Sequence, residues 1–363
     1  MSKKIAIIIA SSAGGACLLF ALFVIVAFGG IENMQDLRDF YNQNLRIVTD
    51  PALLIKWAKA EPAPWSERDS HAAVVFDNKI WVMGGLNGNE KVGGPGHVNY
   101  EGSEYFSDVW SSKDGNKWTL VNSKAPWGER RSMQLVNFNG KIWLIGGWGP
   151  EIGYRNDVWS TQDGVEWVLE KDSAEWSERE GHQVVVFQGK IWLLGGVNYF
   201  TKEIFNDVWY TADGITWIRA TEEAEWSPRW DQAIGVFDNK IWLVGGMILN
   251  QDMYNDIWYS ADGINWTLVT NKAPFRERQG HYMTEYKGKL WVIGRLDGIN
   301  RGKNDIWCSS DGIHWSITKN NPLWLGREDF GGVVFNDEIW ILGGMNKDWE
   351  WTNEVWHSEP ILQ

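Results

Sequence analysis

Short apolar runs alternate with charged and glycine-rich turns along most of the chain, and the same order of segments returns six times. Each cycle opens with an arginine, continues with a mostly apolar run and a two-residue turn, and enters a second run that starts with Ile-Trp or Leu-Trp. The opening arginines are Arg68, Arg130, Arg179, Arg229, Arg278 and Arg327. Their spacings of 62, 49, 50, 49 and 49 residues fit one supersecondary unit per cycle.

The second half of each cycle predicts two further strands. A glycine doublet follows the second run, except in the fifth cycle, which has Gly294-Arg295. A loop then leads to Asp-Val-Trp or Asp-Ile-Trp, for which the last cycle has Glu-Val-Trp. In the first five cycles this motif is followed by Asp-Gly-x-x-Trp. The Asn-Lys, Gly-Lys and Asp-Gly pairs suit tight hairpin turns. Each cycle therefore predicts four short antiparallel strands, a to d in chain order. Six such units form an all-β, six-bladed propeller over residues 51–363.

The sixth cycle lacks a strand d of its own. Trp57 lies 8 residues before Trp65, close to the spacing of 9 residues that separates the strand-d Trp118 from Trp127. We therefore expect residues 51–60 to supply the missing strand beside Trp356, which removes an open sheet edge.

The N-terminal residues follow a different pattern. Lys3 and Lys4 precede an uncharged, mostly apolar stretch, residues 5–28, that is long enough to span a bilayer as a helix. Because positive charges stay in the cytoplasm, the propeller is expected on the periplasmic or extracellular side. We expect residues 1–30 to be a transmembrane anchor and residues 31–50 a juxtamembrane stalk. The alternative is a cleaved signal peptide and a secreted protein, because Ala27 and Gly29 fit the small residues of a cleavage site.

Composition narrows the classes of partner and chemistry. The formal net charge of −13 argues against nucleic acid as a partner. The two cysteines, Cys17 and Cys308, are too few and too far apart for a disulfide framework or a cysteine-rich zinc module. Most of the 27 tryptophans occupy repeated positions, where burial between blades is sufficient to explain them. No cofactor is indicated.

Residues 63–357 resemble kelch-repeat β-propellers in the glycine doublet, the downstream tryptophan and the arginine that opens the next unit. The Trp-rich form is similar to bacterial proteins grouped with the galactose oxidase central domain, and residues 211–217 resemble the Asp-box hairpin of sialidases. The resemblance implies a non-catalytic binding or scaffold module for a protein, peptide or glycan, or a sugar-active enzyme of the epimerase or mutarotase type. Copper oxidase chemistry is disfavoured because Cys308 lies in strand c, and sialidase chemistry because no nucleophilic Tyr–Glu pair can be assigned. A subunit of a membrane assembly is a third possibility.

The strand order places the d–a and b–c loops on one face, which we call the loop face, and the short a–b and c–d turns on the opposite face. Variable sequence is therefore confined to the loop face, where binding residues are expected on a rigid scaffold. Residues that depart from their repeat column are candidates, because they are released from the shared structural role. The candidate ligand-binding residues are Arg131, Trp148, Trp230, Asp231, Arg295, Glu328 and Trp349. Aromatic and charged residues in this mixture suit recognition of a protein, peptide or glycan.

Two repeated features each have a structural and a functional interpretation. The six arginines either form a cationic collar for an anionic ligand or bond loop carbonyls within each repeat, and we favour the second role because every repeat has one. His71, His182 and His281 stand three residues after the arginine in alternate units, an arrangement that could hold a metal ion. The interpretation we favour is that they are ordinary strand residues, with no metal. The long first b–c loop is either a lid or a tolerated insertion.

Overall fold

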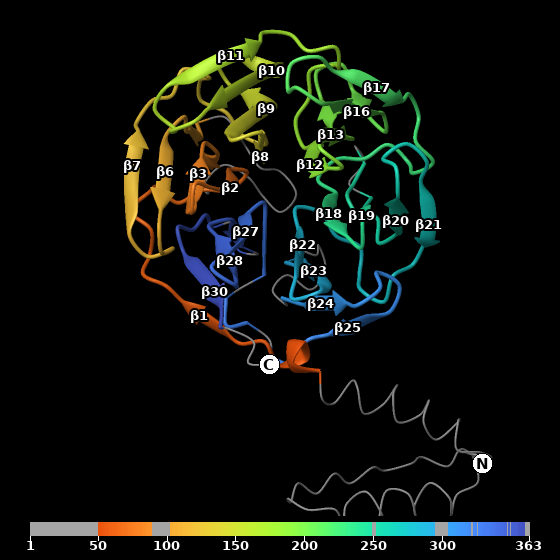
Figure 1. Ribbon diagram of the computed structural model, residues 1–363. Coiled ribbons are helices and arrows are strands. Elements are labelled where there is room, and N and C mark those ends of the chain that lie inside the picture. Colours follow the sequence, from red (N-terminus) through yellow and green to blue (C-terminus); the bar gives the residue numbers. More distant parts are fainter. Residues whose placement is uncertain are drawn as a thin grey trace, which may run out of the picture. The chain divides into compact units, whose positions relative to one another are not determined.

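The computed structural model describes residues 50–88, 102–248, 252–294, 304–320, 322–324, 326–346, 348 and 350–359. Six four-stranded antiparallel sheets stand around a central axis as the blades of a propeller (Figure 1). The predicted all-β, six-bladed propeller is confirmed. In the described ranges there is no α-helix, and no helix that is long and apolar enough to cross a membrane. The predicted anchor and all but the last residue of the predicted stalk lie outside these ranges.

The four strands of each blade follow the order expected from the repeat. Strands a line the axis and contact one another between blades: β2 (Ala72–Phe76), β8 (Gln134–Phe138), β12 (Gln183–Phe187), β18 (Ala233–Phe237), β22 (Tyr282–Tyr286) and β27 (Gly331–Phe335). Strands b come next: β3 (Lys79–Met83), β9 (Lys141–Gly149), β13 (Lys190–Leu194), β19 (Lys240–Val244), β23 (Lys289–Ile293) and β28 (Glu338–Leu342).

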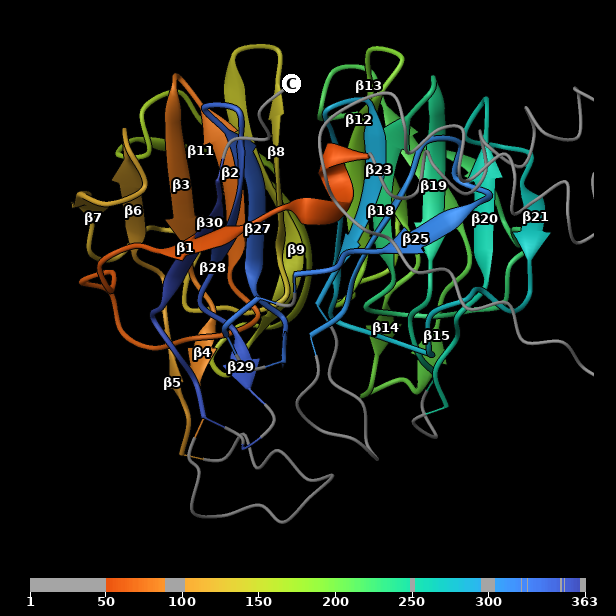
Figure 2. The same ribbon diagram turned by 90° about the horizontal axis from the view of Figure 1, so that it is seen from below.

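The outer two strands complete each sheet. Strands c are β6 (Val109–Ser112), β10 (Gly153–Thr161), β16 (Val208–Thr211), β20 (Ile257–Ser260), β24 (Ile306–Ser309) and β30 (Val355–Ser358). Strands d are β7 (Trp118–Asn122), β11 (Trp167–Lys171), β17 (Ile218–Thr221), β21 (Thr267–Thr270), β25 (Trp315–Ile317) and β1 (Trp57–Lys59). Short strands extend the loop face of three blades (Figure 2): β4 (Leu86–Asn87) with β5 (Glu104–Tyr105), β14 (Val197–Asn198) with β15 (Glu203–Ile204), and β26 (Arg327–Glu328) with β29 (Met345–Asn346).

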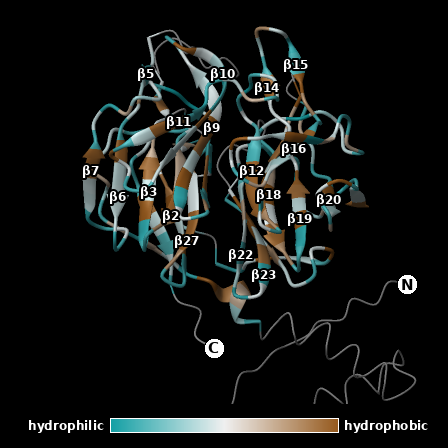
Figure 3. Ribbon diagram, turned by 45° about the horizontal axis from the view of Figure 1, so that its top comes forward, coloured by the Kyte–Doolittle hydropathy of each residue, from teal (hydrophilic) through white to brown (hydrophobic). Residues whose placement is uncertain are grey.

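The core lies between neighbouring blades. Apolar stretches run along strands such as β3 and β9, whereas hydrophilic residues are frequent in the loops (Figure 3). The strand-b tryptophans are almost completely buried, and each donates its indole N–H to the carbonyl five residues earlier in strand a, as Trp81 does to Phe76 at 2.9 Å. The ring then packs under the Asp-Gly turn of the next blade, as Trp81 does under Gly164. Flat, buried indoles thus join consecutive blades.

The repeated arginines hold the loop face together. Their side chains are between 0% and 2% exposed. In four blades a bidentate ion pair joins the guanidinium to the aspartate that opens Asp-Val/Ile-Trp, as between Arg68 and Asp108 at 2.6 and 2.9 Å. In the fifth blade Arg278 donates to one oxygen of Asp305, and in the sixth Arg327 donates to one oxygen of Glu354, the acid of Glu-Val-Trp. Each arginine also donates to the carbonyl of a glycine after strand b. The role in bonding loop carbonyls is confirmed, and the guanidinium groups form no free cationic collar.

The N-terminal segment closes the ring at the place expected from the sequence. Strand β1 pairs with β30, with Trp57 opposite Ser358 and Lys59 opposite Trp356. The Trp57 ring lies 4.6 Å from the Trp324 ring at 86°, which repeats the edge-to-face contact between Trp65 and Trp118 in the first blade. Trp57 therefore takes the place of the sixth strand-d tryptophan.

The residues before β1 differ from the expected extended strand. Residues Pro51–Leu54 form a 3-10 helix, η1. The sixth blade has no Asp-Gly turn to cover Trp291, and Ala52, Leu53 and Ile55 belong to the buried cluster around that indole instead. The helix replaces the missing turn.

We expect Trp57→Ala to lower the free energy of unfolding by about 3–5 kcal/mol, because a buried tryptophan is removed and Trp324 loses its partner ring. Chemical denaturation of the full chain measures this change. Leu54→Ala is the control, because Leu54 is 50% exposed in the same segment. Equal stability of the two variants would show that the ring does not depend on this closure.

Candidate functional site

Two concentric rings of residues surround the axis on the loop face. The outer ring contains the residue directly after each arginine: Asp69, Arg131, Glu180, Trp230, Gln279 and Glu328. Backbone pairing to the residue after a glycine doublet holds five of these six positions, as in Arg131 with Trp148 and Trp230 with Met247. The inner ring contains the next residue of each blade: Ser70, Ser132, Gly181, Asp231, Gly280 and Asp329. We call the two rings and the cavity beside them the mouth.

The inner ring has an unusual and uniform backbone. All six residues have φ between 50° and 63°. This is the left-handed region, which residues other than glycine, asparagine and aspartate rarely adopt. Backbone hydrogen bonds of 2.8–3.1 Å link five of the six neighbouring pairs, for example from the Ser70 N–H to Asp329 O and from the Asp231 N–H to Gly181 O. The chain is therefore fixed in the same conformation in every blade, and the ring presents its side chains toward the axis.

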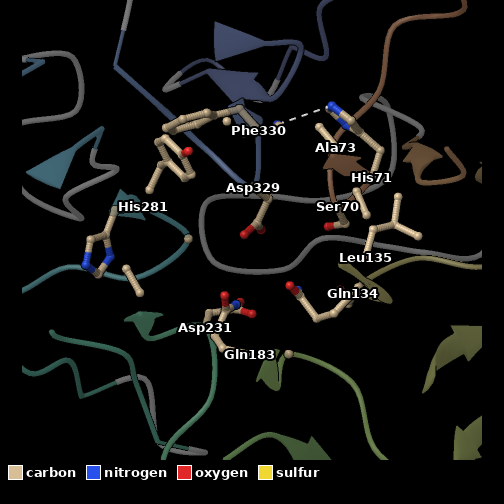
Figure 4. A pocket seen from close by; sticks show the side chains of 18 of the residues that line it. Ser70, His71, Ala73, Gln134, Leu135, Gln183, Asp231, His281, Asp329 and Phe330 are labelled. Atoms are coloured by element: carbon tan, nitrogen blue, oxygen red, sulfur yellow. Dashed lines mark hydrogen bonds between the residues drawn. The ribbon is translucent and has the colours of Figure 1, made fainter. Parts of the chain in front are cut away.

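A cavity of ≈ 220 Å³ lies on the axis, lined by the inner ring and strands a. The carboxylates of Asp231 and Asp329 point into it, facing Ser70, Gln134 and Gln183 (Figure 4). Both aspartates lean over a glycine of the preceding blade: a Cβ at Gly181 would lie 2.9 Å from Asp231 Oδ1, and one at Gly280 would lie 2.5 Å from Asp329 Oδ1. Glycine and aspartate thus alternate, and each glycine makes room for one carboxylate.

The outer ring is tied together by pairs that cross between blades. Arg131 donates to both oxygens of Glu180, at 2.9 Å from Nε and 3.1 Å from Nη2, and Gln279 donates to Glu328 at 2.5 Å. The Arg131 guanidinium also lies over the Trp148 ring, 5.0 Å from its centre. All four hydrogen-bonded residues are at most 9% exposed, so the outer ring is a preformed polar surface rather than a set of mobile charges.

Aromatic side chains border the rings on the side of the first four blades. The Trp148 ring lies 5.5 Å from Tyr105 and 6.4 Å from Tyr154, and the Tyr154 hydroxyl donates to Glu180 Oε1 at 3.3 Å. The Tyr199 ring packs edge-to-face on Trp230 at 5.6 Å and is 41% exposed. Trp148 and Trp230 are half-buried. The mouth therefore offers indole and phenol surfaces beside its charges.

Carboxylates of the mouth have raised pKa values. Burial raises the pKa of Asp69 to about 8, and the nearby Asp329 charge adds to this effect, against the opposing influence of Trp351 and Arg131. Burial also raises the pKa of Asp329 to about 6. For Asp231, burial and then the charges of Asp329, Glu180 and Glu328 hold the pKa well above its ordinary value. Among the residues of the two rings, five are acids and Arg131 is the one cation.

The three histidines pack between blades. The rings of His71, His182 and His281 lie against Gly343, Gly146 and Gly245 of the preceding blades, respectively. Burial, with the charge of the nearby arginine, lowers the pKa of His71 and of His182 to about 3. His71 Nε2 accepts a hydrogen bond from the Gly331 N–H at 3.2 Å. Among the described residues no three His, Cys, Asp or Glu side chains form a group that could hold a metal ion.

The structure brings most of the described sequence-predicted residues to the mouth. Arg131, Trp230 and Glu328 are in the outer ring, Asp231 is in the inner ring, and Trp148 pairs with Arg131. The other two candidates, Arg295 and Trp349, lie outside the described residues, as does much of the first b–c loop.

Sequence reasoning missed two outer-ring acids, Asp69 and Glu180. Both follow a repeat arginine, and Glu180 comes 49 residues after Arg131. Reading this column across adjacent units could have found the ion pair.

Comparisons with known proteins support the fold. Neither a scan of protein-family models nor a search of curated proteins gives a match. A solved structure of YjhT is similar to this chain with a TM-score of 0.65 and 16% sequence identity, over 82% of this chain and 95% of that one. At this identity the likeness shows the propeller fold alone, so membership of the kelch family stays a prediction.

The raised pKa of Asp69 predicts a pH-dependent stability. The folded value of about 8 lies above the ordinary 3.8, so the folded state binds the proton more tightly. The contribution of Asp69 to the free energy of unfolding is complete below about pH 4 and is lost as the pH rises toward 8. Each unit of difference between the folded and unfolded pKa corresponds to about 1.4 kcal/mol of this contribution. We expect Asp69→Asn to reduce this loss when denaturation is measured from pH 4 to 9. Asp77→Asn, at an exposed a–b turn, should keep the wild-type slope. Parallel curves for wild type and Asp69→Asn would contradict the assignment.

Proposed function

We propose that this chain is a kelch-type propeller that works as a non-catalytic binding module and holds a protein, peptide or glycan at the mouth. The observation that carries the proposal is the difference between the two faces. On the opposite face the a–b and c–d turns repeat almost the same residues in the first five blades. At the mouth six blades with one backbone conformation carry different side chains, including Arg131, Trp230 and Asp231. Selective recognition needs a rigid backbone that holds side chains that differ from blade to blade.

The contacts of the mouth suit a binding role. Arg131 and Glu180 are fixed by their mutual ion pair, so little side-chain entropy is lost when a ligand arrives. Trp230 and Tyr199 present partly exposed aromatic surface next to these charges. Tryptophan and arginine in partly desolvated surroundings are the residues that contribute most to binding energy.

We expect Trp230→Ala to weaken ligand binding about 30-fold, the equivalent of about 2 kcal/mol for a central aromatic contact. The full-length protein is first applied to glycan and peptide arrays, and the ligands found are then titrated against both forms. Ile264→Ala is the matched control, because Ile264 is an exposed apolar residue of a c–d turn on the opposite face. A loss caused by Ile264→Ala, with normal binding by Trp230→Ala, would place the ligand on the wrong face for this proposal.

We further propose that residues 5–28 anchor the protein in a membrane, with the N-terminus in the cytoplasm and the propeller periplasmic or extracellular. The support is the apolar stretch behind Lys3 and Lys4. Secretion after signal cleavage is the alternative.

Intact cells that produce Phe200→Cys should react with a membrane-impermeant thiol reagent, because position 200 is 88% exposed on the loop face and Cys308 is buried. The parent protein serves as the control for background labelling. Labelling that requires cell lysis would contradict the export of the propeller, and label found only in the medium would favour the cleaved form.

A further inference from the structure

Acidic side chains outnumber basic ones among the ring residues of the mouth, which the structure describes completely. The repeat arginines are committed to the acids that open Asp-Val/Ile-Trp, and Arg131 is committed to Glu180. No salt bridge joins Asp69, Asp231 or Asp329 to a residue that the structure describes, and the charge of Arg131 offsets the effect of burial on their pKa values only in part. A buried carboxylate without a partner is costly, and proteins that keep one commonly use it.

Asp231 and Asp329, from the fourth and sixth blades, line the axial cavity together, and Asp69 lies in the outer ring directly before the cavity residue Ser70. The charge of Asp329 raises the pKa of Asp69, and after burial it is the largest cause that raises the pKa of Asp231. Asp231 and Asp329 are half-buried and face the axial cavity, so an incoming group can reach them (Figure 4). Asp69 is 5% exposed, and its Oδ1 has no hydrogen-bond partner in the described part of the chain.

A second feature of the mouth is a buried hydroxyl group beside the outer ring. The Tyr105 side chain is 7% exposed, yet its hydroxyl has no hydrogen-bond partner within the described ranges. Burial raises the pKa of Tyr105 to about 12, and the charges of Arg131, Glu180 and Asp69 also affect it, so the hydroxyl lies near the outer ring. Its ring packs with Trp351 and Trp148. A buried hydroxyl oxygen, unpaired carboxylates and indole faces together form an environment for an N–H-bearing cation.

We propose that the mouth receives a lysine or arginine side chain presented by a protein partner, with the carboxylates of Asp69, Asp231 and Asp329 as the accepting groups. This inference rests on the proposed binding function and names its ligand class. A long basic side chain suits the geometry, because its apolar stem can pass the Trp148 and Trp230 surfaces while its charged end reaches the axis. The partner's surface would then meet Tyr199 and Phe200, which are 41% and 88% exposed at the edge of the same face. The net charge of −13 steers a basic partner toward the propeller.

The test compares charged and neutral probes on the full-length protein in detergent. Fluorescence anisotropy is measured with a labelled hexapeptide of alternating lysine and glycine, and with the same peptide in which glutamine replaces lysine. Chitosan trisaccharide and calcium chloride are added as competitors. The lysine peptide should bind more tightly than the glutamine peptide, and neither competitor should displace it at equal concentration.

The decisive variant is Asp231→Asn with Asp329→Asn, and its matched control is Asp77→Asn with Asp238→Asn. Both pairs replace two carboxyl groups with amides, and all four positions have φ between 47° and 54°, a conformation that asparagine tolerates. The control pair lies at a–b turns on the opposite face. We expect the mouth pair to weaken binding of the lysine peptide about tenfold or more and the control pair to change it less than about twofold.

Each other outcome has a defined meaning. Equal weakening by the two pairs would show unspecific attraction to an acidic protein and would overturn the inference. Displacement of the peptide by chitosan or calcium would overturn it in favour of an amino sugar or a metal ion. Binding of neutral ligands that depends on Trp230 but not on Asp231 and Asp329 would leave the binding function standing and refute the cationic ligand. The melting temperatures of both double variants are recorded to exclude unfolding. Because burial raises the pKa values of Asp231 and Asp329, their replacement by asparagine is not expected to lower the melting temperature at neutral pH.

Discussion

The structure depends on one buried contact that is made six times. In it a guanidinium joins the carboxylate next to the Val-Trp or Ile-Trp pair of strand c to the carbonyl of a glycine that follows the Ile-Trp or Leu-Trp run. In the first blade this contact ties Arg68 to Asp108 and to Gly84, three points that are far apart in the sequence and meet on the loop face. Removal of one partner from a buried ion pair costs about 3–5 kcal/mol, because the remaining charge is left without compensation. The contact therefore fixes the start of strand a relative to both inter-strand loops in every blade.

This contact also determines where the mouth residues can lie. Because the arginine side chain is held in place, the backbone of the two residues that follow it, one in the outer ring and one in the inner ring, has a fixed direction. Backbone hydrogen bonds within the inner ring maintain the left-handed φ of the inner-ring residue. Such a conformation costs about 1–3 kcal/mol for a residue with a side chain, and it persists only where the surrounding structure imposes it. Aspartate tolerates it better than most residues, which makes Asp231 and Asp329 compatible with a position where Gly181 and Gly280 occur in other blades.

Much of this organisation could be predicted from the sequence because a repeat shows its structural residues by their recurrence. The six arginines, the glycine doublets and the Trp57 closure followed from spacing alone. The carboxylate partner of each arginine was visible as the repeated Asp of Asp-Val-Trp, but nothing in a single unit reveals that residues 27 to 40 positions apart form an ion pair. The 3-10 helix at Pro51–Leu54 was also hidden, because it replaces a turn that the sixth unit does not contain.

The mouth was only partly predictable for a related reason. Departure from a repeat column singles out a residue such as Trp230, whose type is rare at that position, but it passes over an acid such as Glu180, which reads as ordinary surface charge. What makes Glu180 different is its burial, at 3% exposure, and its contact with a residue of the previous blade. Both properties arise only when the ring closes and equivalent positions of adjacent blades become neighbours. In a propeller, therefore, the structural residues are found by reading along one repeat, whereas the binding residues are found by reading one column around the ring.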